Sequence, residues 1–203
     1  MSTVSTMKST LPTPLSELPA RERILRTAHE LFYRDGIRAT GVDKVIAEAG
    51  VTKVTFYRHF PSKNQLILAF LDYRHQRWIS WFADAMQRYG HTPQAILPSM
   101  AEWFTNGSYR GCAFINTVVE LGDLLPEVRD IARRHKQDMV EVIIKVLPPG
   151  PQVEEEAIAI ALVIDGAIIR AQFDENAQPA LQALERVLLT LLGTCRPQSS
   201  DLL

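Results

Sequence analysis

The stretch of residues 40–63 constrains the fold of this chain more than any other segment. It reads TGVDKVIAEAGVTKVTFYRHFPSK, and its apolar residues recur every three or four positions on both sides of Gly50. That period is helical, and glycine permits the positive φ that a tight turn between two short helices needs. We therefore expect a helix over residues 40–49, a turn at Gly50, and a second helix from residue 52 or 53 to 59. Two short helices joined in this way form a helix-turn-helix.

Two helix start signals frame this unit. Thr40 and Asp43 have the Thr-x-x-Asp spacing at which the first side chain accepts a hydrogen bond from an amide in the first helical turn. Ser62 and Gln65 form the corresponding Ser-x-x-Gln pair. We expect the first pair to open the first short helix, and the second pair to open a long amphipathic helix that ends near Gly90.

The rest of the chain also has the helical period, and no run of residues alternates convincingly at period two. Glycine and proline residues separate the predicted helices. The further helices are expected over residues 24–35, 62–90, 92–106, 112–122, 126–147, 157–169 and 181–192. The sequence therefore predicts an all-α fold of about nine helices.

Charge is distributed unevenly along the 203 residues, although the net charge of the whole chain is only −1. Residues 21–63 carry nine Lys and Arg against five Asp and Glu, whereas residues 64–203 carry twelve against seventeen. A basic segment beside a larger acidic one suggests that the short segment meets a polyanion. The hydrophobic content of 46% excludes a disordered or fibrous protein.

Several kinds of site have no signal in the sequence. Cys112 and Cys195 lack CxxC or Cys/His spacing, so neither a disulfide framework nor a zinc site is expected. The histidines lack HxxxH and HExxH spacing, and no metal or cofactor is predicted. Residues 157–169 form the longest apolar stretch and are too few for the roughly 20 that cross a membrane. Residues 1–19 lack a secretory signal, so we expect a cytoplasmic protein with no membrane partner.

The second short helix has a face suited to double-stranded DNA. The apolar residues of the motif lock the two short helices together, which leaves the opposite face of residues 52–59 outward. A helix with short and cationic side chains on one face fits the major groove of B-form DNA. The side chains on this face are Thr52, Lys53, Val54, Thr55, Tyr57, Arg58 and His59.

Base edges and phosphates require different chemistry from these residues. Lys53 is the candidate for a guanine contact, because a cationic donor reaches the guanine acceptors, and Val54 or Thr55 could meet a thymine methyl group. Arg58 suits a base or a phosphate. Phosphate contacts are expected from polar side chains and from amides at helix starts. The residues with this expected role are Thr40, Gly41, Val42, Tyr57, His59 and Lys63.

From residue 21 to about residue 68 the chain resembles the tetracycline-repressor (TetR) family of bacterial transcriptional regulators. The resemblance rests on the pattern R-x-x-I-L-x-x-A-x-x-L-F-x-x-x-G over residues 21–36 and on AGVTKVTFYRHFPSK over residues 49–63. Many members have Ile-Ala where this chain has Val45-Ile46, a change that keeps an apolar pair. The resemblance implies a regulator, not an enzyme, whose helical remainder encloses a pocket for a small-molecule effector.

The same resemblance implies how such a regulator works. A homodimer would bind a near-palindromic operator and would be released by a small apolar or aromatic effector. Repression is expected, and activation stays open because the same docking geometry serves both. The implied domains are a disordered arm over residues 1–19, the helix-turn-helix domain over 20–63, a ligand-binding and dimerisation domain over 64–195, and a flexible tail over 196–203.

The last two predicted helices carry more apolar surface than one subunit of this size covers, which independently predicts a homodimer. Residues 157–169 are apolar on nearly every side, and residues 181–192 carry a wide apolar stripe. Asp165 and Arg170 interrupt this surface and are interpreted as groups that set the register of the interface. The expected interface residues are Ile160, Ile164, Ile168, Leu184, Val187, Leu188 and Leu191.

The candidate wall of the effector pocket is aromatic and falls on three successive predicted helices and the loop between them. Ordinary core packing is the alternative for each aromatic residue, and a solvated helix face is the alternative for Glu120. The candidates are Trp78, Trp81, Phe82, Trp103, Phe104, Tyr109, Phe114, Asn116 and Glu120.

Cys112 supports a different function. It follows Gly111 at a predicted helix start, where the helix dipole lowers the pKa of a thiol, although a buried inert thiol is the simpler interpretation. The alternative function is therefore a small-molecule-binding or redox-sensing helical protein without sequence-specific DNA binding. An enzyme is not expected, because no nucleophile–base pair, glycine-rich phosphate loop or metal cluster has recognisable spacing.

Overall fold

The computed structural model describes residues 14–174 and 176–194. Nine α-helices and two short 3-10 helices occur among these residues, and no strand does, which confirms the all-α prediction. The chain divides into two compact units, Met1–Leu66 and Ile67–Leu203. Most of the expected N-terminal arm, Cys195 and the expected tail lie outside the described residues. The described end of that arm contains a 3-10 helix, η1 (Leu15–Glu17).

The first unit is built from α1 (Ala20–Asp35), α2 (Val42–Glu48), α3 (Lys53–His59) and the start of α4 (Lys63–Arg88). α1 packs against both α2 and α3, and these two helices pack against each other. The apolar side chains of the motif are completely or nearly completely buried between them, which fixes the angle between α2 and α3. The buried side chains are Ile24, Ala28, Leu31, Phe32, Val45, Ala49, Phe56 and Phe60.

The turn and one of the two predicted start signals are confirmed. Gly50 has a φ of +61°, a left-handed conformation that disfavours other residues, directly between α2 and α3. The amide of Gln65 donates to Ser62 Oγ over 3.1 Å, as the Ser-x-x-Gln signal predicts. The hydroxyl of Thr52 accepts from the amide of Thr55 at the same distance, 3.1 Å, and so caps α3.

The predicted start signal at Thr40 is wrong. α2 begins at Val42, and Gly41 is its N-cap without a side-chain hydrogen bond. Thr40 is completely buried, and its hydroxyl donates instead to the carbonyl of Gly36 over 2.8 Å. A buried hydroxyl takes the acceptor that the interior offers, and here this acceptor lies in the loop after α1. Asp43, the other half of the expected pair, is exposed.

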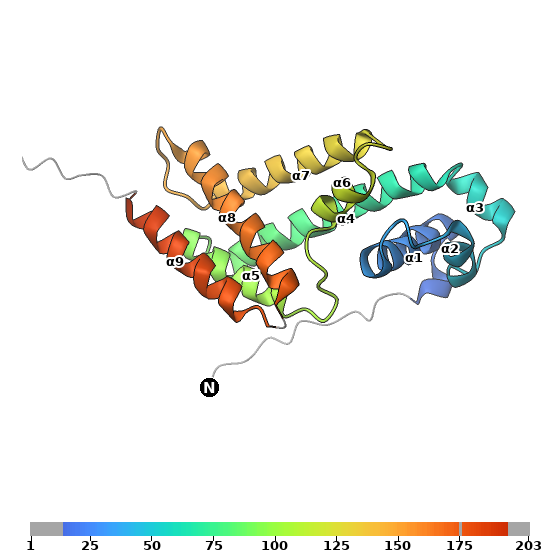
Figure 1. The fold of residues 1–203 in the computed structure, drawn as a ribbon, viewed down its shortest axis with the longest axis horizontal. Helices are drawn as coiled ribbons and strands as arrows, with labels where there is room; N and C mark the ends of the chain where they lie inside the picture. The colour runs from blue at the N-terminus through green and yellow to red at the C-terminus, as the bar shows by residue number, and fades with distance from the viewer. Residues whose placement is uncertain (1–13, 175, 195–203) are drawn as a thin grey trace, which may run out of the picture. The chain divides into compact units, whose positions relative to one another are not determined.

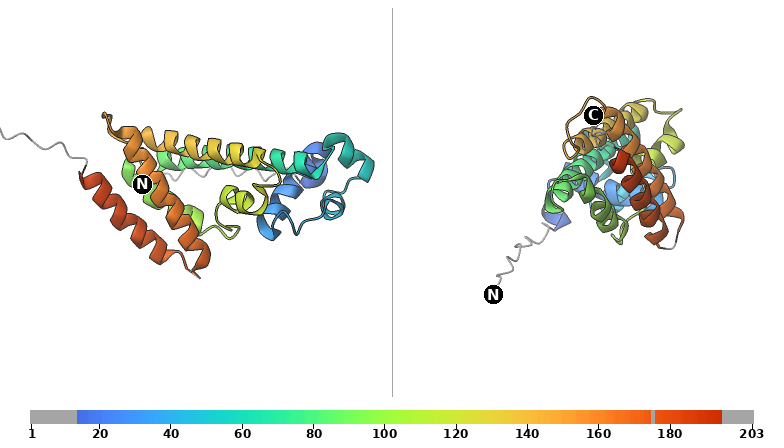
Figure 2. Two further views of the ribbon diagram at one scale, coloured as in Figure 1. Left: turned by 45° about the horizontal axis from the view of Figure 1, so that its top comes forward. Right: turned by 90° about the vertical axis from the view of Figure 1, so that its left-hand side faces the viewer.

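The second unit contains the rest of α4 and the remaining helices (Figures 1 and 2). α6 packs on α7, α7 on α8, α8 on α9, and α9 on α5. α8 and α9 run in opposite directions side by side. These elements are η2 (Pro93–Ala95), α5 (Ile96–Phe104), α6 (Ala113–Leu121), α7 (Glu127–Ile144), α8 (Val153–Phe173) and α9 (Gln178–Thr194).

Two of these helices differ from their predicted extents for local reasons. The helix expected over residues 92–106 is divided into η2 and α5, and Pro98 lies in the first turn of α5, where a missing amide breaks no hydrogen bond. α8 begins four residues before the predicted start. Its first turn holds Glu154, Glu155 and Glu156, whose negative charges favour the positive end of the helix dipole.

Candidate functional sites

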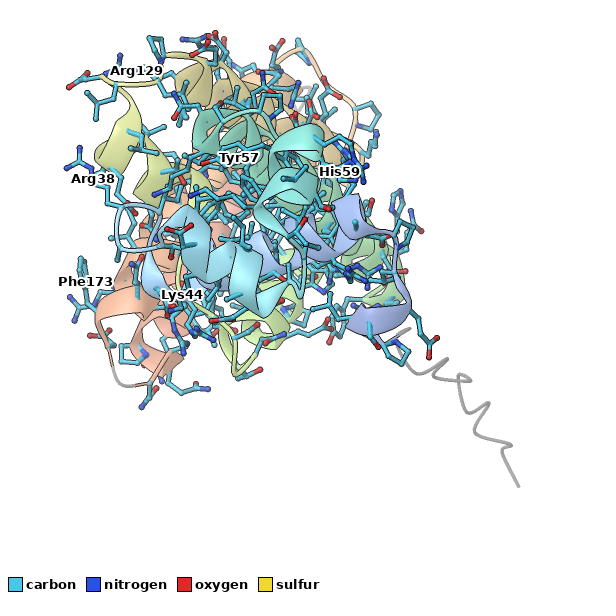
Figure 3. The ribbon with its side chains drawn as sticks, turned by 90° about the vertical axis from the view of Figure 1, so that its right-hand side faces the viewer. Arg38, Lys44, Tyr57, His59, Arg129 and Phe173 are labelled. Carbon is cyan, nitrogen blue, oxygen red and sulfur yellow. The ribbon has the colours of Figure 1, made fainter. Side chains whose placement is uncertain are left out.

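The outer face of α3 is the candidate DNA-reading surface. Among the seven residues of α3, Phe56 alone is buried, and it anchors the helix to the core. Val54 is 80% exposed and Tyr57 42% exposed, and Figure 3 looks onto this part of the unit, with Tyr57 and His59 labelled. Thr52, Lys53 and Arg58 are also exposed, whereas Thr55 and His59 are half-buried. The residues predicted to face DNA are therefore exposed or half-buried, and their contacts with DNA stay predictions.

Lys53 at the start of α3 lies near one carboxylate. Its Nζ is 3.7 Å from Oδ1 of Asp43, and the two side chains are 68% and 87% exposed. An exposed pair at this distance contributes little to stability, so the ammonium group can exchange this contact for another acceptor. Asp43 orients the Lys53 side chain without burying it.

The residues predicted to hold phosphates are placed in different environments. Nζ of Lys63 donates to the carbonyl of Ile37 over 2.6 Å and lies over the ring of Phe32. The same carbonyl accepts from the amide of Thr40 over 3.3 Å, so neither the amide nor the side chain of Thr40 is available. Both residues hold the loop after α1. Gly41 is exposed and Val42 is half-buried at the start of α2, and their roles stay predictions.

Two exposed cations of this unit were not singled out by the motif. Lys44 on α2 donates to Asp35 over 2.9 Å, and Arg38 lies in the loop before α2; both are labelled in Figure 3. The adjacent Arg34 and Lys44 hold the pKa of the Asp35 carboxyl far below its usual range. The uneven charge of residues 21–63 was the only signal for these cations.

Most residues of the predicted dimer interface lie inside the subunit, and the interface itself stays a prediction. Five of them are buried within the subunit itself. They lie on α8 and α9, which pack against each other, and α8 also packs against α7. An apolar helix that packs on its own chain buries one face against that chain. The sequence does not specify which face stays exposed. Val187 is 38% exposed and Leu191 half-buried. The residues buried inside the subunit are Ile160, Ile164, Ile168, Leu184 and Leu188.

A different stripe of α8 is exposed. Large apolar side chains lie outward at intervals of three or four residues, which places them on one helix face. The charged residues of α8 have partners in the same chain, where Asp165 pairs with Lys136 over 2.5 Å and Arg170 with Asp174 over 2.9 Å. Their role in an interface stays a prediction. We call the following residues the α8 stripe: Ile158, Leu162, Gly166, Ile169 and Phe173.

Most predicted pocket residues form a continuous aromatic core. The ring centroids of Trp78 and Phe82 are 4.9 Å apart, those of Trp78 and Trp103 5.4 Å, and those of Trp103 and Tyr109 5.3 Å. Packing at these distances fills space. The indole nitrogen of Trp81 is satisfied, because Trp81 Nε1 donates to Glu102 over 2.9 Å.

A narrow recess beside this core is the candidate ligand site, and three of the predicted pocket residues line it: Trp78, Trp103 and Phe114. Trp81, Phe82, Phe104, Tyr109, Asn116 and Glu120 do not line it. The other lining residues, which the sequence did not point to as a pocket, are Arg74, Cys112, Ala113, His135, Lys136, Met139 and Ile168. The half-buried Asn116 instead donates to the carbonyl of Arg110 over 3.2 Å.

Two histidines meet at the edge of the recess. Nδ1 of His75 and Nδ1 of His135 are 3.3 Å apart, and Nε2 of His75 is 3.2 Å from Oδ2 of Asp138. Burial lowers the pKa of His135 to about 2, and the positive charges of Lys136, His75 and Arg74 add to this effect. Burial also lowers the pKa of His75, against the opposing effect of Asp138. His135 is therefore neutral at pH 7.

Cys112 also lies at the recess. It is buried, and its Sγ is 3.7 Å from Nζ of Lys136. Lys136 is at the same time paired with Asp165. The redox interpretation of Cys112 stays a prediction.

Comparison with known proteins agrees with the geometry of the first unit. Residues 24–70 match the family model for bacterial regulatory proteins of the tetR family. A solved TetR-family transcriptional regulator from Streptomyces coelicolor is 30% identical and has a TM-score of 0.73, with 85% of this chain and 96% of that chain covered. This chain belongs to the TetR family. It is accordingly a helix-turn-helix transcriptional regulator.

Curated TetR-type relatives match over different lengths. The repressor NemR of Escherichia coli K12 is 21% identical over 85% of this chain and 94% of its own length. An uncharacterized HTH-type transcriptional regulator of Lactococcus lactis is 28% identical, and the match spans 54% of this chain and 58% of that protein. No helix in the described part of this TetR-family chain is long and apolar enough to cross a membrane.

The departure from the common TetR pattern has little structural consequence. Val45 is completely buried and Ile46 half-buried, so the pair provides apolar packing in the interior of the first unit. Ala49 beside the turn is also buried.

The stability of this TetR-family protein should depend on pH through His135. Because the pKa of His135 is lowered on folding, the unfolded chain binds the extra proton, and stability falls as pH drops below about 6.5. One such histidine lowers the free energy of unfolding by about 2 kcal/mol between pH 7 and pH 5. Urea denaturation at the two pH values measures this difference.

The variant His135→Leu is the control for this pH dependence. It should lose most of the difference between pH 7 and pH 5, whatever its absolute stability. An unchanged difference in the variant would assign the pH dependence to other groups.

Proposed function

We propose that this protein is a ligand-responsive repressor that binds a near-palindromic DNA operator as a homodimer. The exposed face of α3, anchored by the single buried residue Phe56, carries this proposal. The basic segment around it attracts phosphates at long range, whereas the short side chains of α3 allow close approach to base edges. Two relatives, NemR of Escherichia coli and DhaR of Mycobacterium, are transcriptional repressors, which favours repression.

Reading of the operator is assigned to the start of α3. Lys53 would exchange its contact with Asp43 for guanine acceptors, and the exposed Val54 would pack on a thymine methyl group. Tyr57, Arg58 and His59 would contact phosphates on one side of the groove. Lys63 would serve mainly to hold the loop at Ile37 in place, with a phosphate as a second acceptor.

Dimerisation is assigned to the α8 stripe together with Leu189 on α9. Leu162, Phe173 and Leu189 are 73%, 76% and 68% exposed. Exposing such large apolar side chains to water is unfavourable in a monomer. Gly166 lies within the stripe, and nothing in the subunit is within 4 Å of the space that a side chain there would fill. A second helix could therefore approach α8 closely at this point.

Release by a ligand is assigned to the second unit. A ligand that binds the form with low DNA affinity more tightly shifts the population toward that form. α4 contains residues of both units, including Lys63 beside the DNA-reading helix and Trp78 at the recess. A solved structure with a TM-score of 0.65, that of the multidrug binding protein EbrR, is a complex with malachite green. This complex supports a ligand-binding role for a helical unit of this fold.

Selection from a random duplex library tests the proposed operator. The purified protein should enrich a near-palindrome whose half-sites are centred about one helical turn, or about 10 base pairs, apart or slightly more. Enrichment of a single half-site would contradict the homodimer. Recovery of the library without enrichment would contradict sequence-specific binding.

A further inference from the structure

The recess in the second unit combines an aromatic lining with an unsatisfied polar atom. It lies between α4, α5, α6, α7 and α8, and Trp78, Trp103, Phe114 and His135 supply its rings. In this structure the space between them has room for about one water molecule. A ring-sized ligand can enter only if one of these rings moves.

Trp78 presents a hydrogen-bond donor that has no partner. The residue is only 6% exposed, and its Nε1 is buried without an acceptor among the described residues. An unpaired buried N–H is uncommon and costly, and it is the kind of group that a bound molecule satisfies. The neighbouring Trp81 gives the contrast, because its Nε1 donates to Glu102.

His135 presents the complementary acceptor. Nε2 of His75 donates to Asp138, which leaves Nδ1 of neutral His75 as an acceptor. Nδ1 of His135, 3.3 Å away, must then carry the hydrogen that joins the two rings. Nε2 of His135 is therefore a lone-pair acceptor. The recess thus offers one N–H donor and one nitrogen acceptor.

The stacking around His135 indicates a flat ligand. The ring of Phe114 lies 3.7 Å from that of His135, at an angle of 17°, and the ring of Trp78 meets His135 nearly edge-on at 5.0 Å. Phe114 therefore covers one face of the imidazole, and a ligand gains room beside His135 only when Phe114 moves. Because Phe114 belongs to α6, a ligand that replaces it has to displace part of α6.

The charges at the recess favour a neutral ligand over an anion. Of the two cations that line the recess, Lys136 is paired with Asp165, and Arg74 also has a partner. The histidine pair faces Asp138. Arg134 on the same side of α7 pairs with Asp72. These paired charges leave the neutral donor and acceptor as the groups that select a ligand.

We propose that this recess binds a small neutral planar aromatic molecule with a hydroxyl group, of which phenol is the simplest example. The hydroxyl would accept from Trp78 Nε1 and donate to His135 Nε2 in the plane of the imidazole, and the ring would enter space that Phe114 vacates. The inference deepens the proposed ligand-responsive function and rests on it, because the bound molecule would be the effector that displaces α6.

Isothermal titration of the full-length protein with phenol, toluene and benzoate tests this assignment without DNA. Phenol should bind saturably, at least about tenfold more tightly than toluene, because toluene leaves both polar groups unpaired. Benzoate should bind more weakly than phenol. Tighter binding of toluene or benzoate, or no saturable binding of phenol, would overturn the proposal.

Two matched tryptophan variants locate the site. Trp78→Phe keeps a ring but removes the N–H donor, and should weaken phenol binding about tenfold. Trp81→Phe, whose N–H is already satisfied outside the recess, should leave phenol affinity unchanged. Equal effects of the two variants would refute the assignment to the recess. Operator binding by the phenol-free protein is measured separately, so loss of phenol binding with operator binding intact would overturn this inference and leave the DNA-binding function standing.

Discussion

Leu162→Glu should convert the dimer into a monomer and weaken operator binding by about a hundredfold or more. Leu162 lies at the centre of the α8 stripe and is 73% exposed in the subunit. In a symmetric dimer the substitution would bury two unpaired carboxylates, each at a cost of about 3–5 kcal/mol. The second DNA-reading head would then no longer be linked to the first, and its contribution to affinity would be lost. Sedimentation equilibrium measures the first effect and fluorescence anisotropy the second.

Val119→Glu is the matched control for this substitution. Val119 is 82% exposed and lies on α6, outside the α8 stripe. The same charge placed there should leave the protein dimeric with unchanged operator affinity. Dimer loss in the Val119 variant, or a Leu162→Glu protein that remains a dimer, would show that the interface lies elsewhere.

Lys53→Ala should lower operator affinity by about 1–3 kcal/mol and should relax the sequence preference at one base pair of each half-site. Lys53 makes only a long contact with Asp43 in the subunit, so its removal should leave the fold and the dimer intact. Because a base contact discriminates between sequences, affinity for a scrambled duplex should change much less. Fluorescence anisotropy titrations measure the affinity for the operator and the affinity for the scrambled duplex.

Lys63→Ala provides the comparison for Lys53→Ala. Lys63 donates to the carbonyl of Ile37, and a phosphate is its only assigned DNA partner. Its removal should weaken operator and scrambled duplexes by similar factors, with a measurable loss of thermal stability. A similar pattern for Lys53→Ala, with equal losses on both duplexes, would contradict the assigned base contact.

The helices and the exposure of α3 could be predicted because local patterns determine them. The period of apolar residues around Gly50 predicted α2, α3 and their turn. Gly50 was expected to permit a positive φ in that turn, and its φ is +61°. The start signal at Thr40 could not be distinguished from a buried threonine, because both place a small polar residue before an apolar helix. Only the structure supplies the competing acceptor, the carbonyl of Gly36.

The dimer face and the recess depend on which elements pack together, and periodicity does not specify that. α8 is apolar on nearly every side, so the buried Ile164 and the exposed Leu162 looked alike in the sequence. His135 was missed because a lone histidine in an amphipathic helix has no spacing signal. Its partner, His75, lies 60 residues away on another helix.

The affinity of the protein for two duplexes of equal composition, the selected operator and the same operator with one half-site scrambled, tests the central claim most directly. The account predicts tight binding to the intact palindrome and at least about a hundredfold weaker binding when one half-site is lost, at both low and physiological salt. Equal affinity for the two duplexes, falling steeply and together as salt rises, would mean that the exposed face of α3 binds DNA only through its phosphates, and would contradict the account.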